Sequence, residues 1–249
     1  MMRRKLIAGN WKMNGDLAAL VELEAIARAA TANPSVDVGI GVPATLIAPA
    51  AARVPGFAIG AEDVHPAESG AFTGCISAGM VRDVGATFAI IGHSERRDGF
   101  SETDADVKNK AEALLRHGLS GILCIGETLD QRAVGDAITV VTGQVRASMP
   151  QGASSRWLSI AYEPIRAIGT GHTPTVADVA AMHGAIRTTL AELLGDDAQN
   201  MRILYGGSVT AENAPSLLGA GDVDGALVGG ASLTAAKFVP IVTAAAALA

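Results

Sequence analysis

The sequence has few cysteines and no excess of basic residues. Cys75 and Cys124 are the only two thiols among 249 residues. Two isolated thiols form neither a disulfide framework nor a metal site, so we expect a cytoplasmic protein without a structural metal. The 19 basic and 25 acidic side chains give a net charge of −6. Nucleic-acid-binding domains usually carry a basic excess, so this balance argues against that class.

Long apolar runs and runs of like charge are also missing. The segment Met1–Ala8 has basic residues but no apolar run of signal-peptide length. The closing apolar run, Ala244–Ala249, is far shorter than a membrane span. The sequence contains no Walker A motif, which argues against ATP binding. These absences predict a protein that neither crosses a membrane nor uses ATP.

Eight short β-rich runs alternate with helical patterns along the chain. The expected strands are Lys5–Ala8, Val36–Val42, Phe57–Ala61, Thr87–Gly92, Gly121–Gly126, Trp157–Tyr162, Arg202–Gly206 and Gly225–Gly229. The expected helices are Asp16–Ala30, Ala44–Arg53, Ser77–Asp83, Thr103–Arg116, Leu129–Ser148, Thr175–Leu194, Ala211–Leu218 and Ser232–Ala247. The strands are nearly continuous apolar runs, as is typical of parallel strands covered on both faces. No change in composition marks a second domain. The pattern predicts an α/β fold, a (β/α)8 TIM barrel formed by residues 1–249 as a single domain, with an open doubly wound sheet as the alternative.

Polar side chains and glycines gather directly after the expected strands. Asn10 and Lys12 follow the first strand, His93 follows the fourth, and Glu163 ends the sixth, where Pro164 stops the strand. In a barrel the carboxyl ends of all strands lie on one face, which is where such folds carry their active sites. Ordinary loop composition is the alternative explanation, because loops are polar and rich in glycine in any case.

The residue types in this cluster suit proton transfer next to a carbonyl group. A carboxylate such as Glu163 can remove a proton bound to carbon, while an imidazole and an ammonium stabilise the resulting enediolate oxygens. A helix that starts at Ser94, with Ser94 as its cap, would favour the neutral form of the His93 imidazole. This chemistry needs no metal and no cofactor.

Three sets of small residues could hold a phosphate group. They are Gly169-Thr170-Gly171, Gly206-Gly207-Ser208 and Gly229-Gly230. Backbone N–H groups at such positions bind phosphate, and barrels often hold phosphate after strands seven and eight. Each set alone is equally consistent with a simple turn, so it is their expected convergence at one barrel mouth that favours an anion site.

A competing pattern favours a nicotinamide-dependent dehydrogenase. The stretch Gly39-Ile40-Gly41-Val42-Pro43-Ala44 matches a dinucleotide-binding fingerprint, and Glu62 and Asp63 follow about 20 residues later. Pro43 falls within the turn that this fingerprint requires, and the dehydrogenase hypothesis leaves Lys12, His93 and Glu163 without a role. A non-catalytic barrel would leave them without a role as well.

Several motifs closely resemble those of the triosephosphate isomerase family. They are Gly9–Asn14, Gly70–Gly74, Gly92–Arg97, Cys124–Glu127, Ala161–Pro164 together with Ala167–Gly171, Tyr205–Val209 and Gly229–Leu233. They occur in order over most of the chain, so the resemblance is extensive and specific. It implies the interconversion of dihydroxyacetone phosphate and glyceraldehyde 3-phosphate in glycolysis and gluconeogenesis. Isomerisation of a tetrulose phosphate is the nearest alternative.

The resemblance also assigns roles to individual residues. It implies that Glu163 is the catalytic base, that His93 is a neutral electrophile, that Asn10 and Lys12 stabilise the enediolate, and that Glu95 supports them. Asn10, Lys12, Gly169, Gly171, Ser208, Gly229 and Gly230 would bind the substrate or its phosphate. The closing lid would comprise Pro164, Ile165, Arg166, Ala167, Ile168, Gly169, Thr170, Gly171, His172 and Thr173, with Tyr205 as a latch. A homodimer would form through the loop around Phe72, Thr73 and Cys75, which would reach the partner near Asn10 and Lys12.

The chain departs from the family pattern in the lid and in the expected interface. Arg166 and His172 replace a usual tryptophan and lysine at the two lid hinges, and Arg166 could pair with Glu127. Glu62-Asp63 replaces a common Gln-Asn pair, and Cys75 replaces an acid that would pair with an arginine at the position of Arg96. These departures should affect lid kinetics and the strength of the dimer and leave the chemistry unchanged.

Overall fold

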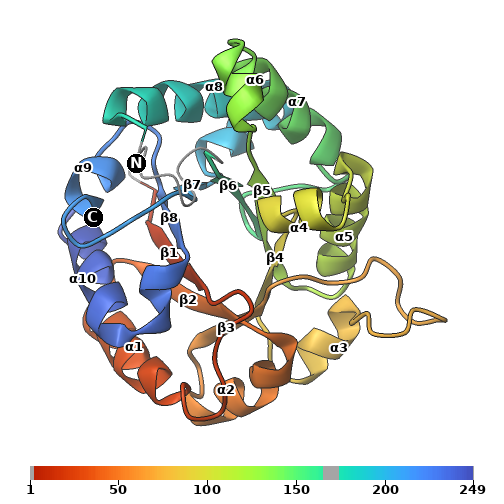
Figure 1. Ribbon diagram of the computed structural model, residues 1–249, viewed down its shortest axis with the longest axis vertical. Coiled ribbons are helices and arrows are strands. Elements are labelled where there is room, and N and C mark those ends of the chain that lie inside the picture. The colour runs from red at the N-terminus through yellow and green to blue at the C-terminus, as the bar shows by residue number, and fades with distance from the viewer. Residues whose placement is uncertain (1–2, 165–173, 249) are drawn as a thin grey trace.

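The eight predicted strands form a closed barrel in the computed structural model, which describes residues 3–164 and 174–248. All neighbouring strands are parallel and follow chain order, and the last strand pairs with the first (Figure 1). Their bounds are β1 Leu6–Asn10, β2 Asp37–Val42, β3 Ala58–Ala61, β4 Phe88–Ile91, β5 Ser120–Ile125, β6 Leu158–Tyr162, β7 Ile203–Tyr205 and β8 Gly225–Val228. The (β/α)8 prediction is confirmed, and the open-sheet alternative is wrong.

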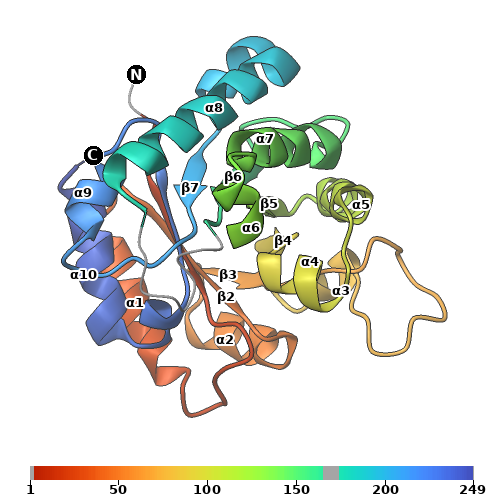
Figure 2. The same ribbon diagram turned by 45° about the horizontal axis from the view of Figure 1, so that its top comes forward.

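Helices surround the barrel on its outer face (Figures 1 and 2). Their bounds are α1 Val21–Ala32, α2 Ile47–Arg53, α3 Ala78–Asp83, α4 Ser94–Gly99, α5 Asp104–Arg116, α6 Leu129–Ala133, α7 Ala137–Ser148, α8 Val176–Leu194, α9 Ala214–Leu218 and α10 Ala235–Ala246. Within residues 3–164 and 174–248, short 3₁₀ helices add Ala44–Leu46 (η1), Gly195–Gln199 (η3) and Gly230–Leu233 (η4).

The prediction of one helix over Leu129–Ser148 was wrong. The structure has two helices, α6 and α7, and Gly135 between them has a φ of +89°. A left-handed residue cannot continue a right-handed helix, and glycine adopts that conformation without strain. The predicted starts at Asp16 and Ala211 were also early, because α1 begins at Val21 and α9 at Ala214.

Alternate residues of the strands fill the barrel interior, and the others pack against the helices. The interior cluster consists of Ala8, Phe88, Ile90, Ile122, Cys124, Ala161, Leu204 and Leu227. A Cβ atom at Gly60 would lie 2.4 Å from the Phe88 ring, so glycine makes room for this large side chain. Because strand side chains alternate between faces, Glu163 shares the inward face with Ala161 and lies at the barrel mouth.

The dinucleotide fingerprint at Gly39 and Gly41 has a different explanation. Both glycines lie inside strand β2, where Cβ atoms would come within 3.0 Å of Phe88 and 2.9 Å of Ile90. They permit packing inside the barrel and do not form a phosphate-binding turn. The dehydrogenase hypothesis therefore loses the motif on which it rested.

The loop between β3 and α3 projects away from the barrel in both views (Figures 1 and 2). Phe72 in this loop is about half exposed, and its ring lies 4.1 Å from that of His65. Exposed aromatic side chains on a protruding loop often mark a contact with another protein.

A buried ion-pair network fixes the end of the barrel at which the strands begin. Asp224, which precedes β8, accepts from Arg3 Nε at 2.7 Å, from Arg187 Nη2 at 2.7 Å and from the Ile203 N–H at 3.0 Å. The carboxylate is thus shared by the N-terminal segment, α8 and β7. In the part of the chain that the structure describes, no helix is both long enough and apolar enough to cross a membrane.

Candidate active site

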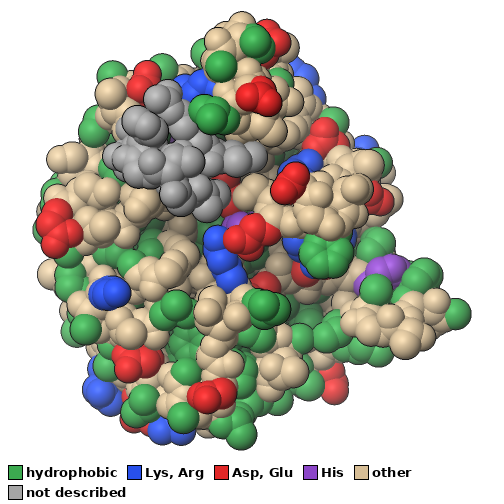
Figure 3. Space-filling view, in the orientation of Figure 1, with side chains coloured by type: hydrophobic (Ala, Val, Ile, Leu, Met, Phe, Trp, Pro, Cys, Tyr) green, Lys and Arg blue, Asp and Glu red, His purple; other side chains and the backbone are tan. Residues whose placement is uncertain are grey.

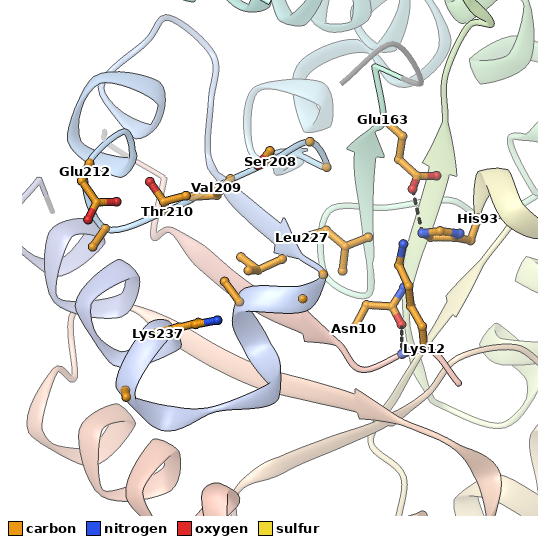
Figure 4. A pocket seen from close by; sticks show the side chains of 18 residues that line it. Asn10, Lys12, His93, Glu163, Ser208, Val209, Thr210, Glu212, Leu227 and Lys237 are labelled. Carbon is orange, nitrogen blue, oxygen red and sulfur yellow. Dashed lines mark hydrogen bonds and ion pairs between the residues drawn. The ribbon is translucent and has the colours of Figure 1, made fainter. Parts of the chain in front are cut away.

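Glu163 follows β6 directly and lies almost completely buried, with 1% of its surface exposed. Its backbone N–H donates to the Ile125 carbonyl at 2.8 Å, which fixes the end of β6 against β5. Its carboxylate accepts from the Ser94 N–H at 2.9 Å and lies 2.8 Å from His93 Nε2 (Figure 4). A buried carboxylate needs such partners, and here two come from the segment that follows β4, two strands away from β6.

Small residues surround Glu163 on both sides. A Cβ atom at Gly126 would lie 2.1 Å from the Glu163 carbonyl oxygen, and one at Gly206 would lie 2.9 Å from its Cγ. Cys124 is also adjacent: burial, and then the nearby Glu163 charge, raise the pKa of its thiol well above the ordinary value. The thiol therefore stays protonated and acts as a packing group.

His93 caps helix α4 with its own ring. Its Nδ1 accepts the Glu95 backbone N–H at 3.2 Å, so the sequence-based expectation that Ser94 is the cap was wrong. Ser94 is instead the first residue of the helix, and its N–H points to Glu163. Because Nδ1 receives a proton donor, the ring proton lies on Nε2, the nitrogen that faces Glu163.

Lys12 adopts a strained backbone conformation just after β1. Its φ is +58°, in the left-handed region that side chains other than glycine rarely adopt. Its backbone N–H donates to Asn10 Oδ1 at 3.1 Å, and its ammonium lies 2.8 Å from Glu95 Oε1. Figure 4 shows the Lys12 side chain extending toward His93 and Glu163. Strain of this kind is retained where the surroundings hold the residue, and it is frequent at functional sites.

These side chains share one cavity of about 600 Å³ at the carboxyl ends of the strands. Asn10, Lys12, His93 and Glu163 line one wall, and the loops after β7 and β8 line the other. Figure 3 shows acidic, basic and histidine side chains gathered near the centre of this face. The structure places seven of the predicted site residues on this cavity: Asn10, Lys12, His93, Glu163, Ser208, Gly229 and Gly230.

Buried hydrogen bonds connect the loops after β1 and β8. The Trp11 indole N–H donates to the Ser232 carbonyl at 3.0 Å, and the Ser232 hydroxyl donates to the Gly229 carbonyl at 2.7 Å. A Cβ atom at Gly229 would be 3.6 Å from Lys12 Cε. The glycines at the end of β8 are thereby held beside Lys12.

Lys237 is a cavity residue that sequence reasoning missed. It lies in the first turn of α10, and its ammonium points toward the cavity (Figure 4). The signal was faint, because a single lysine on a helix is usually a surface residue. The available hint was its position three residues after Thr234, which precedes the last helix and follows Gly229-Gly230 closely in the sequence.

Part of the predicted lid lies outside the described residues. These positions are Ile165, Arg166, Ala167, Ile168, Gly169, Thr170, Gly171, His172 and Thr173, so their predicted roles stay predictions. Tyr205 is buried, and its hydroxyl has no hydrogen-bond partner among the described residues. Burial raises the pKa of this phenol to about 12.

Glu127, the partner expected for Arg166, already has two partners in the described structure. Its Oε1 accepts from Arg132 Nε at 2.7 Å and from the Tyr162 hydroxyl at 3.1 Å. Burial, and then the nearby Glu127 charge, raise the pKa of Tyr162. The second carboxylate oxygen, Oε2, is buried without a partner among the described residues.

The departures at Asp63 and Cys75 have a common structural consequence. Cys75 is exposed on the protruding loop, while Arg96 pairs within the chain, with Asp63 at 3.0 Å and with Glu102. Arg96 therefore pairs with two acids of its own chain. In the family pattern its partner would be an acid at the position of Cys75 in the interface loop. Among the described residues, no three His, Cys, Asp or Glu side chains are grouped so that they could hold a metal ion.

Comparison with known proteins identifies the family. The family model described as triosephosphate isomerase matches residues 5–245. The triosephosphate isomerase of Xanthobacter flavus is 57% identical over 244 residues, covering 97% of this chain and 98% of that protein. That of Ruegeria sp. (strain TM1040) is 50% identical over 99% of this chain and 100% of its own length. The crystal structure of triosephosphate isomerase from Bartonella henselae is 42% identical, with a TM-score of 0.91 over 97% of this chain and 98% of that one. The chain belongs to the triosephosphate isomerase family.

Proposed function

We propose that the protein interconverts dihydroxyacetone phosphate and D-glyceraldehyde 3-phosphate through an enediolate, with Glu163 as the base. The observation that carries this proposal is the contact of 2.8 Å between the buried Glu163 carboxylate and His93 Nε2, beside the Lys12 ammonium. Base, proton donor and cation thus converge on one cavity. The role in glycolysis and gluconeogenesis, and a location in the cytoplasm, follow from the same assignment.

The reaction moves one proton between two adjacent carbons. Glu163 takes a proton from C1 of the ketose, and the electron pair of that C–H bond forms the enediolate double bond while the C2 carbonyl becomes an oxyanion. The proton then returns from Glu163 to C2. The C1 hydroxyl gives up its proton and becomes the aldehyde oxygen, and the C2 oxyanion takes up a proton and becomes a hydroxyl, so that one proton passes between the carbons and one between the oxygens. The Glu163 carboxylate contacts His93 Nε2 and the Ser94 N–H, so a substrate carbon has to come within reach of the same carboxylate for the base to act.

His93 and Lys12 act on the oxyanion. The His93 Nε2–H, fixed by the hydrogen bond from the Glu95 N–H to Nδ1, is the donor that a substrate oxygen would meet. The Lys12 ammonium places a positive charge near the same oxygen, and Asn10 holds the Lys12 backbone in place. Donors that are fixed before the reaction stabilise developing charge without having to reorganise.

The loops after β7 and β8 supply the phosphate site. Ser208, Gly229 and Gly230 offer backbone N–H groups on the wall opposite Glu163, and Gly171 would add another from outside the described residues. Lys237 contributes a positive charge at the outer edge of the same wall. Backbone N–H groups next to a short helix suit an anion, because each has a positive end and no intrahelical partner.

The replacement Glu163→Gln tests this function. It keeps the size of the side chain and removes the base, so kcat should fall by roughly 10²–10⁴. Glu192→Gln, on the outer helix α8, makes the same change of charge at an exposed position and serves as the matched control. Circular dichroism checks that both variants fold. A correctly folded Glu163→Gln protein with nearly full activity would contradict the assignment.

The same assay separates the alternatives. A coupled assay that compares triose and tetrulose phosphates should give the higher kcat/KM for the triose. Addition of NAD should leave the protein fluorescence unchanged, whereas a dehydrogenase would quench or shift it. Preference for the tetrulose phosphate would reassign the substrate.

We also propose a homodimer through the protruding loop around Phe72, Thr73 and Cys75. Phe72 is half exposed, and Met13 beside the cavity is 97% exposed, so each chain presents apolar side chains at both ends of the expected contact. Sedimentation across protein concentration tests the dimer, and Phe72→Asp should shift the equilibrium toward monomer. Full activity in a stable monomer would refute the need for the loop.

A further inference from the structure

A second cavity, of about 780 Å³, adjoins the active site and contains an acid that the mechanism does not use. Asn10, Lys12 and His93 line both cavities, so Lys12 forms part of the boundary between them. Glu62, directly after β3, lies in this second cavity. It is one of the two positions at which the chain has an acid where its family commonly has an amide.

The surroundings of Glu62 disfavour a negative charge. Its Oε1 is buried and has no hydrogen-bond partner among the described residues. Loss of hydration on burial raises the pKa of Glu62 to about 8, with Glu95 adding to the shift and with the Lys12 backbone N–H and ammonium opposing it. Near neutral pH this side chain is therefore a carboxylic acid resting against the backbone of Lys12.

The other charged groups of the cavity already have partners. Arg96 and Lys110 both pair with Asp63 and Glu102. Lys12 pairs with Glu95 across the boundary. These contacts use the cations that face the cavity from the β1–α1 loop, α4 and α5.

The remaining ionisable groups do not neutralise Glu62. His65 Nδ1 accepts the Ala67 N–H at 3.1 Å, His93 Nδ1 accepts the Glu95 N–H, and Asp106 caps α5 with Thr103. The exposed Cys75 thiol lies on the loop side of the cavity. Among the described residues, no cation is thus left to form an ion pair of its own with an ionised Glu62.

We propose that Glu62 is a positioning residue for Lys12: as a neutral acid it supports the strained Lys12 backbone, and on losing its proton it opposes the binding of an anionic substrate. This rests on the proposed role of Lys12 in the isomerase reaction. The Lys12 φ of +58° has to be maintained by its neighbours: Asn10 Oδ1 accepts its backbone N–H at 3.1 Å, and Glu62 lines the same cavity beside it.

Ionisation would change the charge that the substrate meets. The Lys12 ammonium would then lie between two carboxylates, Glu95 and Glu62, and the local balance would become negative. A substrate phosphate and an enediolate oxygen are both anionic, so both would be bound more weakly. An extra unit charge at this range weakens the binding of an anion by about five- to tenfold.

Glu62→Gln separates the effect of the Glu62 proton from the effect of the size and shape of the side chain. Glutamine has the size of glutamic acid, can accept the Lys12 N–H and stays neutral at every pH. Glu62→Ala removes the support as well as the proton. The proposal predicts that glutamine, but not alanine, maintains the catalytic function of Lys12.

The experiment measures kcat, KM and the inhibition constant of inorganic phosphate from about pH 6.5 to 9.5, around the raised pKa. In the natural chain phosphate should bind about five- to tenfold more weakly at the upper end than at neutral pH. The Glu62→Gln protein should show no such loss, and the Glu192→Gln control should behave as the natural chain does. Glu62→Ala should lower kcat at every pH. Infrared spectroscopy at neutral pH should show a carboxylic acid band that Glu62→Gln lacks.

Two results would overturn the proposal. One is an identical pH dependence of phosphate binding in the natural chain and in Glu62→Gln, with no difference in the carboxylic acid band. The other is sedimentation showing that the loss at high pH follows dissociation into monomers, because Glu62 would then act on association and not on Lys12. Phosphate binding and the infrared band do not require turnover, so failure of the isomerase assignment would be recognised separately.

Discussion

Gly126, the residue after β5, should control the position of the catalytic base although it makes no contact with substrate. An added Cβ atom would lie 2.1 Å from the Glu163 carbonyl oxygen and 3.4 Å from its Cβ. The contact at 2.1 Å is with a backbone atom, and a backbone atom cannot move aside by a change of rotamer. The ends of β5 and β6 would therefore have to separate in Gly126→Ala.

The required movement can be worked out from this contact. Real Cβ atoms stay more than 3.0 Å from such neighbours, so the Glu163 backbone must move by about 1 Å. This weakens the 2.8 Å hydrogen bond from the Glu163 N–H to the Ile125 carbonyl and carries the carboxylate away from His93. A misplacement of about 1 Å in a catalytic group lowers the rate about 10²-fold.

Steady-state kinetics and calorimetry test this reasoning. Gly126→Ala should lower kcat far more than it changes KM, because the phosphate loops after β7 and β8 are not moved. The control is Gly143→Ala in α7, where an added Cβ meets nothing within 4 Å and should stabilise the helix by about 0.5–1 kcal/mol. A folded Gly126→Ala protein with the kcat of the natural chain would refute the argument that this glycine is required for the placement of Glu163.

Three further perturbations follow from the contacts described above. Gly230→Val should fold normally, because an added Cβ meets nothing within 4 Å. It should raise KM, because the side chain fills space that the substrate phosphate would occupy. An unchanged inhibition constant for inorganic phosphate would contradict this. Asp224→Ala should destabilise the fold by about 3 kcal/mol in urea unfolding, because Arg187 would lose a buried partner. The unfolding free energy should also depend on pH, measured at one protein concentration. The Glu62 pKa rises from 4.5 to about 8 on folding, so the folded chain keeps a proton that the unfolded chain releases, and stability falls as pH rises through that window by about 3–5 kcal/mol. Glu62→Gln should remove this fall. His183 has the opposite sign, because burial lowers its pKa from 6.5 to about 4, so its contribution is lost as pH falls through that range.

The arrangement of the barrel was predictable because it depends on periodic features of the sequence. Apolar runs at regular intervals indicate strands buried on both faces, and eight of them close most simply into a barrel. Once the strands are parallel, Asn10, His93 and Glu163 must meet, since each lies at or just after the carboxyl end of a strand. The meeting of these residues therefore followed from topology and required no knowledge of side-chain contacts.

The details that escaped prediction depend on local competition among nearby groups. His93 competes with Ser94 for the cap of α4, and the imidazole takes that position while the Ser94 N–H and hydroxyl both donate to Glu163. Arg96 has acids available on two elements and pairs with those in its own chain. Gly135 ends α6 through a dihedral angle, which helical periodicity does not reveal. To predict each outcome one would need the local geometry: the distances between neighbouring groups and the dihedral angles of the backbone.

The seam where β8 meets β1 has a consequence for how activity appears during folding. Asn10 and Lys12 lie at one end of the chain and Gly229 at the other, and the Trp11–Ser232 hydrogen bond joins two segments separated by 221 positions. Contacts of such high sequence separation form late, because the intervening chain must first be ordered. A chain that lacks its last βα unit therefore keeps Asn10 and Lys12 beside β2 but lacks Gly229, Gly230 and the Ser232 carbonyl, so the anion site is complete only when the last βα unit packs against the first.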